Sequence, residues 1–270
     1  MATLHTHALV LRSNDFGESD RILHLLTPDT GRLTVIAKGA RRSVKRFGGN
    51  IDFFNHLRVQ VERRRPASMA RLEHARLERT FHGLREEPAR FGLACYVLEL
   101  LDRLAPEGGA PAEREGLFRF GLGALDWIDR ETPDLRMRIL LELRTLDAVG
   151  LRPEFVRCVR CGEALGPSDG PQVAFRVADG GPLCRACQEP SEAGLPIHLG
   201  TLRALKASVG FPLDRLGRIG WGAGAVAEAQ VLLHRFLRFH VGPELRSEGF
   251  LGQLTLRGPE GKLRPPERPS

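Results

Sequence analysis

The chain has 270 residues, 42% of them hydrophobic, and a formal net charge of +7 at pH 7. These values predict two or three small folded domains and exclude a chain too polar to build a core. No apolar run reaches the roughly 18 residues of a membrane span, and no charged leader precedes an apolar stretch at the N-terminus. Neither a membrane helix nor a signal peptide is therefore predicted.

Residues 1–80 are predicted to form a small closed β-barrel of the OB type. Apolar Leu57, Val59 and Val61 alternate with polar residues, which is typical of a half-buried strand. Five short strands in this length favour a barrel, because closure removes exposed strand edges. Besides the strand around Val59, strands are predicted at 4–12, 20–26, 32–38 and 68–78.

The surplus positive charge lies in this first part of the chain. Up to Arg79 there are 15 Lys and Arg against 8 Asp and Glu, and from residue 81 onward the two classes balance. An excess of this kind predicts a surface for a polyanion, most often nucleic acid, although a solvated loop could carry it too. Five basic residues follow one another with no acid between them: Lys38, Arg41, Arg42, Lys45 and Arg46.

Three phenylalanines stand next to these basic residues, namely Phe47, Phe53 and Phe54. We expect at least two of them to be core residues. A phenylalanine that stays exposed could stack on a nucleic-acid base.

The rest of the chain is predicted to be helical, apart from a cysteine-containing module. Thr132 is the expected N-cap of a helix whose first residue is Pro133 and which Gly150 ends. We assign residues 81–150 and 195–251 to one helical domain, residues 151–194 to the module and residues 252–270 to a disordered tail. The predicted helices cover 88–105, 112–129, 133–149, 199–208 and 223–241.

Four of the five cysteines form two close pairs, Cys158-x2-Cys161 and Cys184-x2-Cys187. Each pair can direct two thiolates at one point, and four thiolates complete the tetrahedral coordination of Zn²⁺. The pattern predicts a structural zinc site, because four cysteines leave no position for a catalytic water. Gly162 permits a tight turn after the first pair, and the fifth cysteine, Cys95, is expected in the core of a helical face.

Two alternatives to the zinc site are weaker. A thioredoxin-like redox pair would need one motif rather than two, and a disulfide framework suits secreted chains better than this one. Arg157, Arg160 and Arg185 stand beside the cysteines and would favour the thiolate forms. His198 lies nearby in the sequence but is surplus to a four-cysteine site.

No catalytic motif is found, and the chain is not predicted to be an enzyme. It has no Walker A sequence, no G-x-S-x-G elbow and no H-E-x-x-H metal helix. Gly220-x-Gly222-x-x-Ala225 imitates a dinucleotide fingerprint, but no buried strand precedes it.

Several motifs near the N-terminus carry a resemblance to a known family. They are Gly-Glu-Ser-Asp-Arg-Ile-Leu at 17–23, Thr-Pro-Asp-Thr-Gly at 27–31 and Ala-Lys-Gly-Ala-Arg-Arg at 37–42. Gly-Leu-Arg-Pro at 150–153 then leads into the cysteine module, and Leu-Arg-Ser at 245–247 comes before Gly-Phe-Leu at 249–251. In order and spacing these motifs resemble the bacterial RecO family of recombination mediators over residues 4–251.

The resemblance implies an α+β multi-domain protein: an N-terminal OB fold, then an all-α domain carrying an inserted four-cysteine zinc module. It implies that Lys38, Arg41 and Arg42 contact DNA, to which the charge pattern adds Lys45 and Arg46. It also implies that Zn²⁺ is held by Cys158, Cys161, Cys184 and Cys187. One departure is Asp52, which stands near the expected DNA face where many members carry proline.

The function implied is that of a DNA repair mediator of the RecF pathway. Such proteins bind single- and double-stranded DNA and anneal complementary strands. With RecR, they help RecA to load on DNA coated by single-stranded DNA-binding protein (SSB). We expect a cytoplasmic, nucleoid-associated protein with a basic-rimmed apolar groove for the acidic SSB C-terminal tail. An RNA-binding OB-fold protein with structural zinc and a zinc-dependent nucleic-acid enzyme remain as alternatives.

Overall fold

The structure is a computed structural model that describes residues 2–47, 49–63, 68–189, 192–213, 215, 219–242 and 245–253. The chain divides into two compact units, Met1–Thr132 and Pro133–Ser270. The expected helical domain therefore draws residues from both units, and its bounds stay a prediction. Most of the predicted tail, residues 254–270, lies outside the described residues. Among the described helices, none combines the length and apolar character needed to cross a bilayer.

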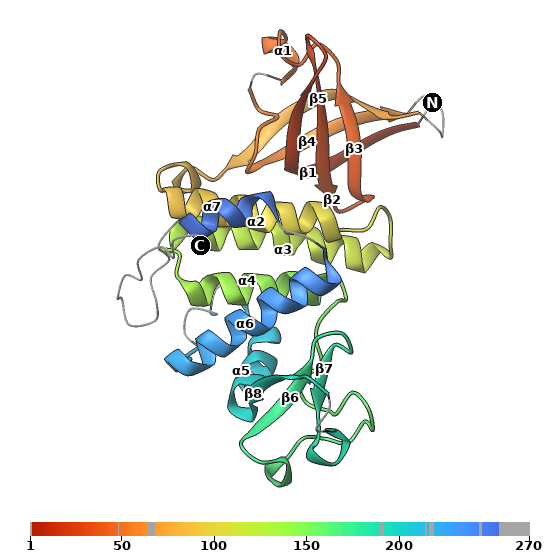
Figure 1. The fold of residues 1–270 in the computed structure, drawn as a ribbon. Helices are drawn as coiled ribbons and strands as arrows, with labels where there is room; N and C mark the ends of the chain where they lie inside the picture. Colours follow the sequence, from red (N-terminus) through yellow and green to blue (C-terminus); the bar gives the residue numbers. More distant parts are fainter. Residues whose placement is uncertain are drawn as a thin grey trace. The chain divides into compact units, whose positions relative to one another are not determined.

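The first unit contains a closed five-stranded barrel with the strand order β1-β2-β3-β5-β4 (Figure 1). Its neighbours run antiparallel except β3 and β5, which pair in parallel at Val35–Ala70 and Ile36–Arg71. This arrangement confirms the predicted barrel of OB type. The strands are β1 (Ala2–Phe16), β2 (Asp20–Thr27), β3 (Gly31–Ala37), β4 (Asn55–Arg63) and β5 (Ala70–Thr80).

The barrel interior follows the alternation in the sequence. Leu57, Val59 and Val61 of β4 are buried, whereas Arg58 between them is exposed. Phe47, which ends the short helix α1 (Val44–Phe47), is buried, and so is Phe54. Two of the three phenylalanines beside the basic residues therefore belong to the core, as expected.

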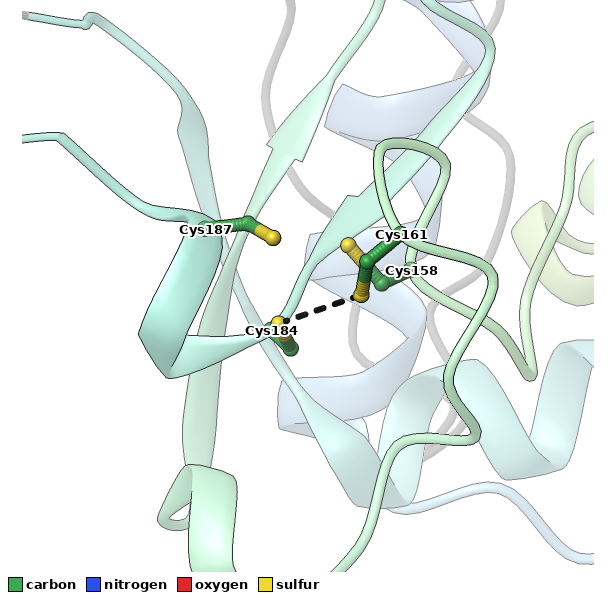
Figure 2. A group of neighbouring side chains, drawn as sticks. All are labelled: Cys158, Cys161, Cys184 and Cys187. Carbon is green, nitrogen blue, oxygen red and sulfur yellow. Dashed lines mark hydrogen bonds between the residues drawn. The ribbon is translucent and has the colours of Figure 1, made fainter.

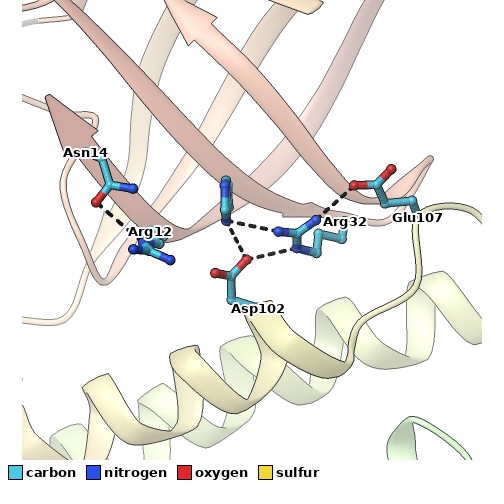
Figure 3. Close-up of polar contacts among 6 residues, drawn as sticks. Arg12, Asn14, Arg32, Asp102 and Glu107 are labelled. Carbon is cyan, nitrogen blue, oxygen red and sulfur yellow. Dashed lines mark hydrogen bonds and ion pairs between the residues drawn. The ribbon is translucent and has the colours of Figure 1, made fainter. Parts of the chain in front are cut away.

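After η1 (Gly83–Arg85), two helices complete the first unit, α2 (Pro88–Leu104) and α3 (Pro111–Arg130). An ion-pair network joins the end of α2 to the barrel (Figure 3). Asp102 Oδ1 lies 2.8 Å from Arg32 Nε and 2.7 Å from His24 Nδ1. Arg32 also pairs with the exposed Glu107 at 2.9 Å. The Asp102 side chain is only 10% exposed. Little water could therefore solvate Arg32 or Asp102 if its partner in the ion pair were removed.

We expect Asp102→Ala to destabilise the first unit by about 2–4 kcal/mol, because it leaves the mostly buried Arg32 guanidinium with only the exposed Glu107 as a carboxylate partner. The measurement is denaturant unfolding followed by Trp127 fluorescence in a Trp221→Phe background, so that only the first unit reports. Glu107→Ala is the matched control and should cost less than about 1 kcal/mol, because that carboxylate is exposed. Equal unfolding midpoints for the two variants would contradict the assignment.

The second unit combines helices with a small sheet of order β7-β6-β8. Its strands are β6 (Gln172–Arg176), β7 (Gly181–Leu183) and β8 (Leu195–His198). The helices are α4 (Leu135–Ala148), α5 (Leu199–Val209), α6 (Ala223–His240) and α7 (Arg246–Gln253), with short turns η2 (Pro167–Asp169) and η3 (Arg185–Cys187).

Helix α4 begins later than predicted. Asp134, not Thr132, is the N-cap, because its carboxylate accepts a 2.6 Å hydrogen bond from the Met137 amide. Pro133 therefore precedes the helix instead of opening it. Gly150 does end the helix as expected, with a left-handed φ of 76°.

Candidate nucleic-acid interface and metal centre

The basic segment, which we define as residues 38–46, follows β3 and is anchored by Ser19, in the turn between β1 and β2, and by Asp20, the first residue of β2. Asp20 Oδ1 accepts from the Gly39 amide at 2.8 Å, and Asp20 Oδ2 pairs with Lys38 Nζ at 2.6 Å. The Arg41 amide donates to the Ser19 carbonyl at 3.0 Å. Two motifs that are separate in the sequence, 17–23 and 37–42, thus form one structural feature.

These contacts lower the pKa of Asp20, chiefly through the Gly39 amide and then through Lys38. Since the folded pKa lies below the unfolded one, the stability gained is present above the unfolded pKa and is lost as pH falls through the folded pKa.

We expect Asp20→Asn to accelerate hydrogen exchange at Gly39 and Arg41 at neutral pH. Asp15→Asn is the control, and a wild-type exchange rate at Gly39 in Asp20→Asn would contradict this anchor.

The five predicted DNA contacts differ in how strongly they are engaged within the protein. Arg46 donates to the Lys38 carbonyl, lies 3.8 Å from a Glu73 oxygen and places its guanidinium 5.0 Å from the centre of the Phe47 ring. Arg46 and Lys38 therefore help to shape the segment. The sequence did not reveal these partners, because Asp20 and Glu73 are far from them along the chain.

Among the segment's cations whose side chains are described, Arg41 and Arg42 have the weakest contacts within the protein; Arg41 donates to the Glu18 carbonyl at 3.4 Å. The Arg41 side chain is 44% exposed, and its Nε lies 3.6 Å from an oxygen of the exposed Asp15. Arg42 is exposed, and no ion pair joins it to any described residue. Lys45 lies in α1, and its side chain is outside the described part of the structure.

The four paired cysteines come together in the second unit (Figure 2). Their sulfur atoms all lie within 4.8 Å of one another, and Cys161 Sγ is 3.7 Å from Cys184 Sγ. Four sulfurs around one Zn²⁺ with bonds near 2.3 Å stand about 3.8 Å apart. The donor set and its spacing thus fit a tetrahedral metal, and this confirms the predicted four-cysteine cluster.

Backbone geometry shapes both turns of this cluster. Gly162 has a φ of 79°, and its amide donates to the Cys158 carbonyl at 2.9 Å, as the sequence predicted for a tight turn. Arg160 joins the two turns by donating to the Cys187 carbonyl at 2.7 Å, and it pairs with Glu192. Arg160 therefore acts as a connector rather than as a free charge for the thiolates.

The cluster favours ionisation of one cysteine first. Burial would raise the pKa of Cys158, but hydrogen bonds from the backbone amides of Cys184, Cys161 and Arg160 outweigh it and lower the pKa to about 6. Hydrogen bonding to the Cys184 and Cys161 thiols raises the pKa of Cys187. Because metal ligands must lose their protons, metal binding here should strengthen as pH rises.

The remaining candidates lie outside the cluster. The His198 ring hydrogen-bonds to Glu228, so its partner is a carboxylate. Cys95 is partly buried on α2, and burial followed by the nearby Glu99 raises its pKa to about 11. It therefore stays a thiol at neutral pH. Among the described residues, the four cysteines are the only group of three or more possible ligands.

The second unit also contains a groove of about 920 Å³ between the β6–β8 side and α6. Phe239 lines it and is 60% exposed. Arg235 and Arg238 line the same groove, are exposed, and have no ion pair with any described residue. His240 Nε2 lies 2.8 Å from the Val177 carbonyl, and this contact joins the C-terminal end of α6 to the loop after β6. Glu192 also lines the groove, but it pairs with Arg176 and Arg160, so the unpaired charges described at its rim are the two arginines of α6.

These features define a class of protein in which an OB-type barrel, a fold widely used to bind nucleic acids, is followed by helices and a four-cysteine cluster. Residues 1–81 match the family model described as Recombination protein O N terminal, and residues 85–249 match Recombination protein O C terminal. The chain therefore belongs to the RecO family of DNA repair proteins, which confirms the resemblance.

Relatives named DNA repair protein RecO support this assignment. The chain is 35% identical to the one from Anaeromyxobacter dehalogenans strain 2CP-C, over 91% of this chain and 94% of the relative. It is also 34% identical to the one from Roseiflexus sp. strain RS-1, over 92% of this chain and 85% of the relative. The identity to the one from Myxococcus xanthus strain DK1622 is again 34%, over 92% of this chain and 97% of the relative. The similarity thus spans both units.

Proposed function

We propose that this chain binds single- and double-stranded DNA through its basic segment, anneals complementary strands and, with RecR, helps RecA to load on SSB-coated DNA. The observation that carries the proposal is the pair of exposed arginines, Arg41 and Arg42, on a segment that Asp20 anchors to the barrel. Anchoring reduces the ordering entropy that DNA binding would otherwise cost.

The chemistry of the segment favours phosphate contacts over base reading. Guanidinium groups make bidentate, charge-assisted hydrogen bonds to phosphate oxygens, and such contacts carry no sequence information. Phe47 and Phe54 are buried, so of the three phenylalanines beside the segment only the half-buried Phe53 has a ring that a base could stack on. We therefore expect binding that tolerates any sequence.

Annealing by this route requires no catalytic residue. Neutralised phosphates reduce repulsion between two strands, and strands held on one protein meet at a raised effective concentration. The protein would thus work in the cytoplasm at the nucleoid as a mediator rather than as an enzyme.

The test of this proposal is competition for a labelled oligo(dT) by unlabelled DNA and RNA of equal length at equal salt. We expect DNA to compete at least as well as RNA. The log–log salt slope should lie between about −1.4, for Arg41 and Arg42 alone, and about −3.5, for all five basic residues. Strong preference for RNA would instead support the RNA-binding alternative and overturn the proposal.

The groove beside α6 supports the expected contact with the SSB tail. An acidic peptide that ends in an aromatic residue complements the arginines of the rim and the apolar wall at Phe239. We infer that the tail binds here.

Arg238→Glu is expected to weaken binding of a fluorescent SSB-tail peptide at least about tenfold, because a carboxylate would repel the acidic tail. Fluorescence anisotropy gives the affinity. Arg119→Glu, an equally simple charge reversal on exposed α3, is the control and should bind the peptide as wild type does. Normal binding by Arg238→Glu would place the tail elsewhere.

We also propose that the four cysteines hold structural Zn²⁺. Bound metal would supply a crosslink between the two turns and no open coordination position. Apart from the sulfur ligands, the core around the cluster is very small: Leu183 is buried, with Val159 and Leu165 packed against it. The two turns that carry the cysteines therefore need the metal as their core.

A further inference from the structure

The outer face of three neighbouring barrel strands carries positive and titratable side chains in register. One row across β1, β4 and β5 consists of His7, Arg58 and Arg76, which are successive Cα partners. The next row consists of His5, Gln60 and His74. We call His5, His7, Arg58, His74 and Arg76 the His-Arg face.

These side chains point away from the barrel core. The inward positions between them are taken by buried residues such as Leu57 and Val59. Arg58, His5 and His74 are exposed, and the Arg76 side chain is 84% exposed. The face is therefore open to a ligand within its own unit.

The arrangement is unfavourable unless an anion binds to it. Arg58 and Arg76 stand directly opposite each other, and like charges at such positions destabilise a sheet. Within the described residues, no ion pair joins Arg58 or His74 to a carboxylate. Arg76 has only Glu78, at 4.0 Å. Two arginines directly opposite each other, without a carboxylate close enough to balance both, are typical of a functional surface rather than of a surface selected for stability.

The groups around the face are few. Glu62 belongs to a row further along β4, opposite Thr3 and Arg71. At the other end His56 lies 3.0 Å from His7, between ring nitrogens, and edge-on to Phe118. Burial and then His7 lower the pKa of His56, while Glu78 opposes and Arg79 adds to this shift.

We propose that the His-Arg face binds the phosphate backbone of a second nucleic-acid strand. The inference rests on the proposed function, because an annealing protein must hold two strands at once. The basic segment offers Arg41 and Arg42 to the first strand. The face offers two arginines and three histidines on adjacent strands, which lie about 4.8 Å apart, while alternate positions along one strand lie about 6.7 Å apart.

The two surfaces lie on the same barrel and approach each other at β5. Helix α1 contacts β5, and Arg46 reaches to 3.8 Å from Glu73, the residue before His74. Two strands bound on these surfaces would therefore be held near one another. A histidine becomes cationic when it is protonated, so capture of the second strand should strengthen on the acidic side.

The test uses the full-length protein and two non-complementary oligonucleotides, one carrying a donor and the other an acceptor fluorophore. Energy transfer reports two strands on one protein, and anisotropy of the donor strand alone reports the first. We expect Arg58→Gln/Arg76→Gln to reduce energy transfer at least about fivefold and to change first-strand binding less than twofold. Arg41→Ala/Arg42→Ala should instead weaken first-strand binding.

A second readout separates a binding role from a structural one. Energy transfer in the wild type should increase between pH 8 and pH 6, and His5→Gln/His74→Gln should flatten that increase. If Arg58→Gln/Arg76→Gln gives wild-type energy transfer while the wild type binds DNA, the His-Arg face is not the second site. If the wild type binds no DNA, the proposed function fails together with this inference.

Discussion

Replacing Cys184 with serine should abolish metal binding and unfold the two turns that carry the cysteines. The variant loses one of four sulfur donors from a cluster whose remaining apolar core is small. In isolated zinc modules the free energy of metal binding, of order 10–16 kcal/mol, is also the free energy of folding. Zinc content after dialysis should fall from about one per chain to near zero, and the segment around residues 158–187 should become sensitive to protease.

Cys95→Ser is the matched control for this experiment. Cys95 lies on α2 in the other unit, so its replacement should leave the zinc content and the protease pattern of the module unchanged. A chelator should reproduce the effect of Cys184→Ser in the wild type. Full zinc content together with a wild-type protease pattern in Cys184→Ser would contradict a four-thiolate site.

Replacing Arg41 and Arg42 together with alanine should weaken DNA binding about tenfold or more at moderate salt, because two charge-assisted phosphate contacts are lost. The loss should be similar for all DNA sequences, since phosphates carry no base information. The slope of log affinity against log salt should become flatter by about 1.4 on single strands. Titrations by anisotropy at four or five salt concentrations provide both quantities.

The control is Arg119→Ala, which removes an exposed arginine from α3, away from the basic segment. Like each single replacement in the segment, it removes one positive charge. It therefore separates the effect of losing a charge at the basic segment from the effect of a lower net charge. Its salt slope should equal that of the wild type. A loss confined to certain sequences, or no loss in Arg41→Ala/Arg42→Ala, would refute the assignment of these arginines to phosphates.

Local patterns were enough to predict most of the fold. The alternation at Leu57, Val59 and Val61 identified a strand, since burial on one face imposes period two on the sequence. The paired cysteines predicted their cluster equally well, because their spacing already meets the geometry of a tetrahedral ion. The parallel pairing of β3 with β5 could not be predicted from the sequence, because a contact of two residues between distant segments produces no periodic pattern of apolar residues.

Long-range partners explain what the sequence did not show about the site. Lys38 and Arg46 look the same as Arg41 and Arg42 in the sequence, but Asp20 and Glu73 engage them from other strands. Threonine before proline predicts an N-cap at Thr132, whereas in the folded chain the carboxylate of Asp134 accepts the capping hydrogen bond from the Met137 amide. Thr132 and Asp134 are both common N-cap residues, and only the hydrogen bonds of the folded chain show which of them caps the helix.

We propose above all that this RecO family protein anneals DNA that SSB has coated. The most direct measurement is the annealing rate of complementary oligonucleotides precoated with SSB from the same organism, with and without the protein. We predict acceleration that is lost when the SSB tail is removed and reduced in Arg41→Ala/Arg42→Ala. Acceleration on bare DNA alone, or none at all, would contradict the mediator role.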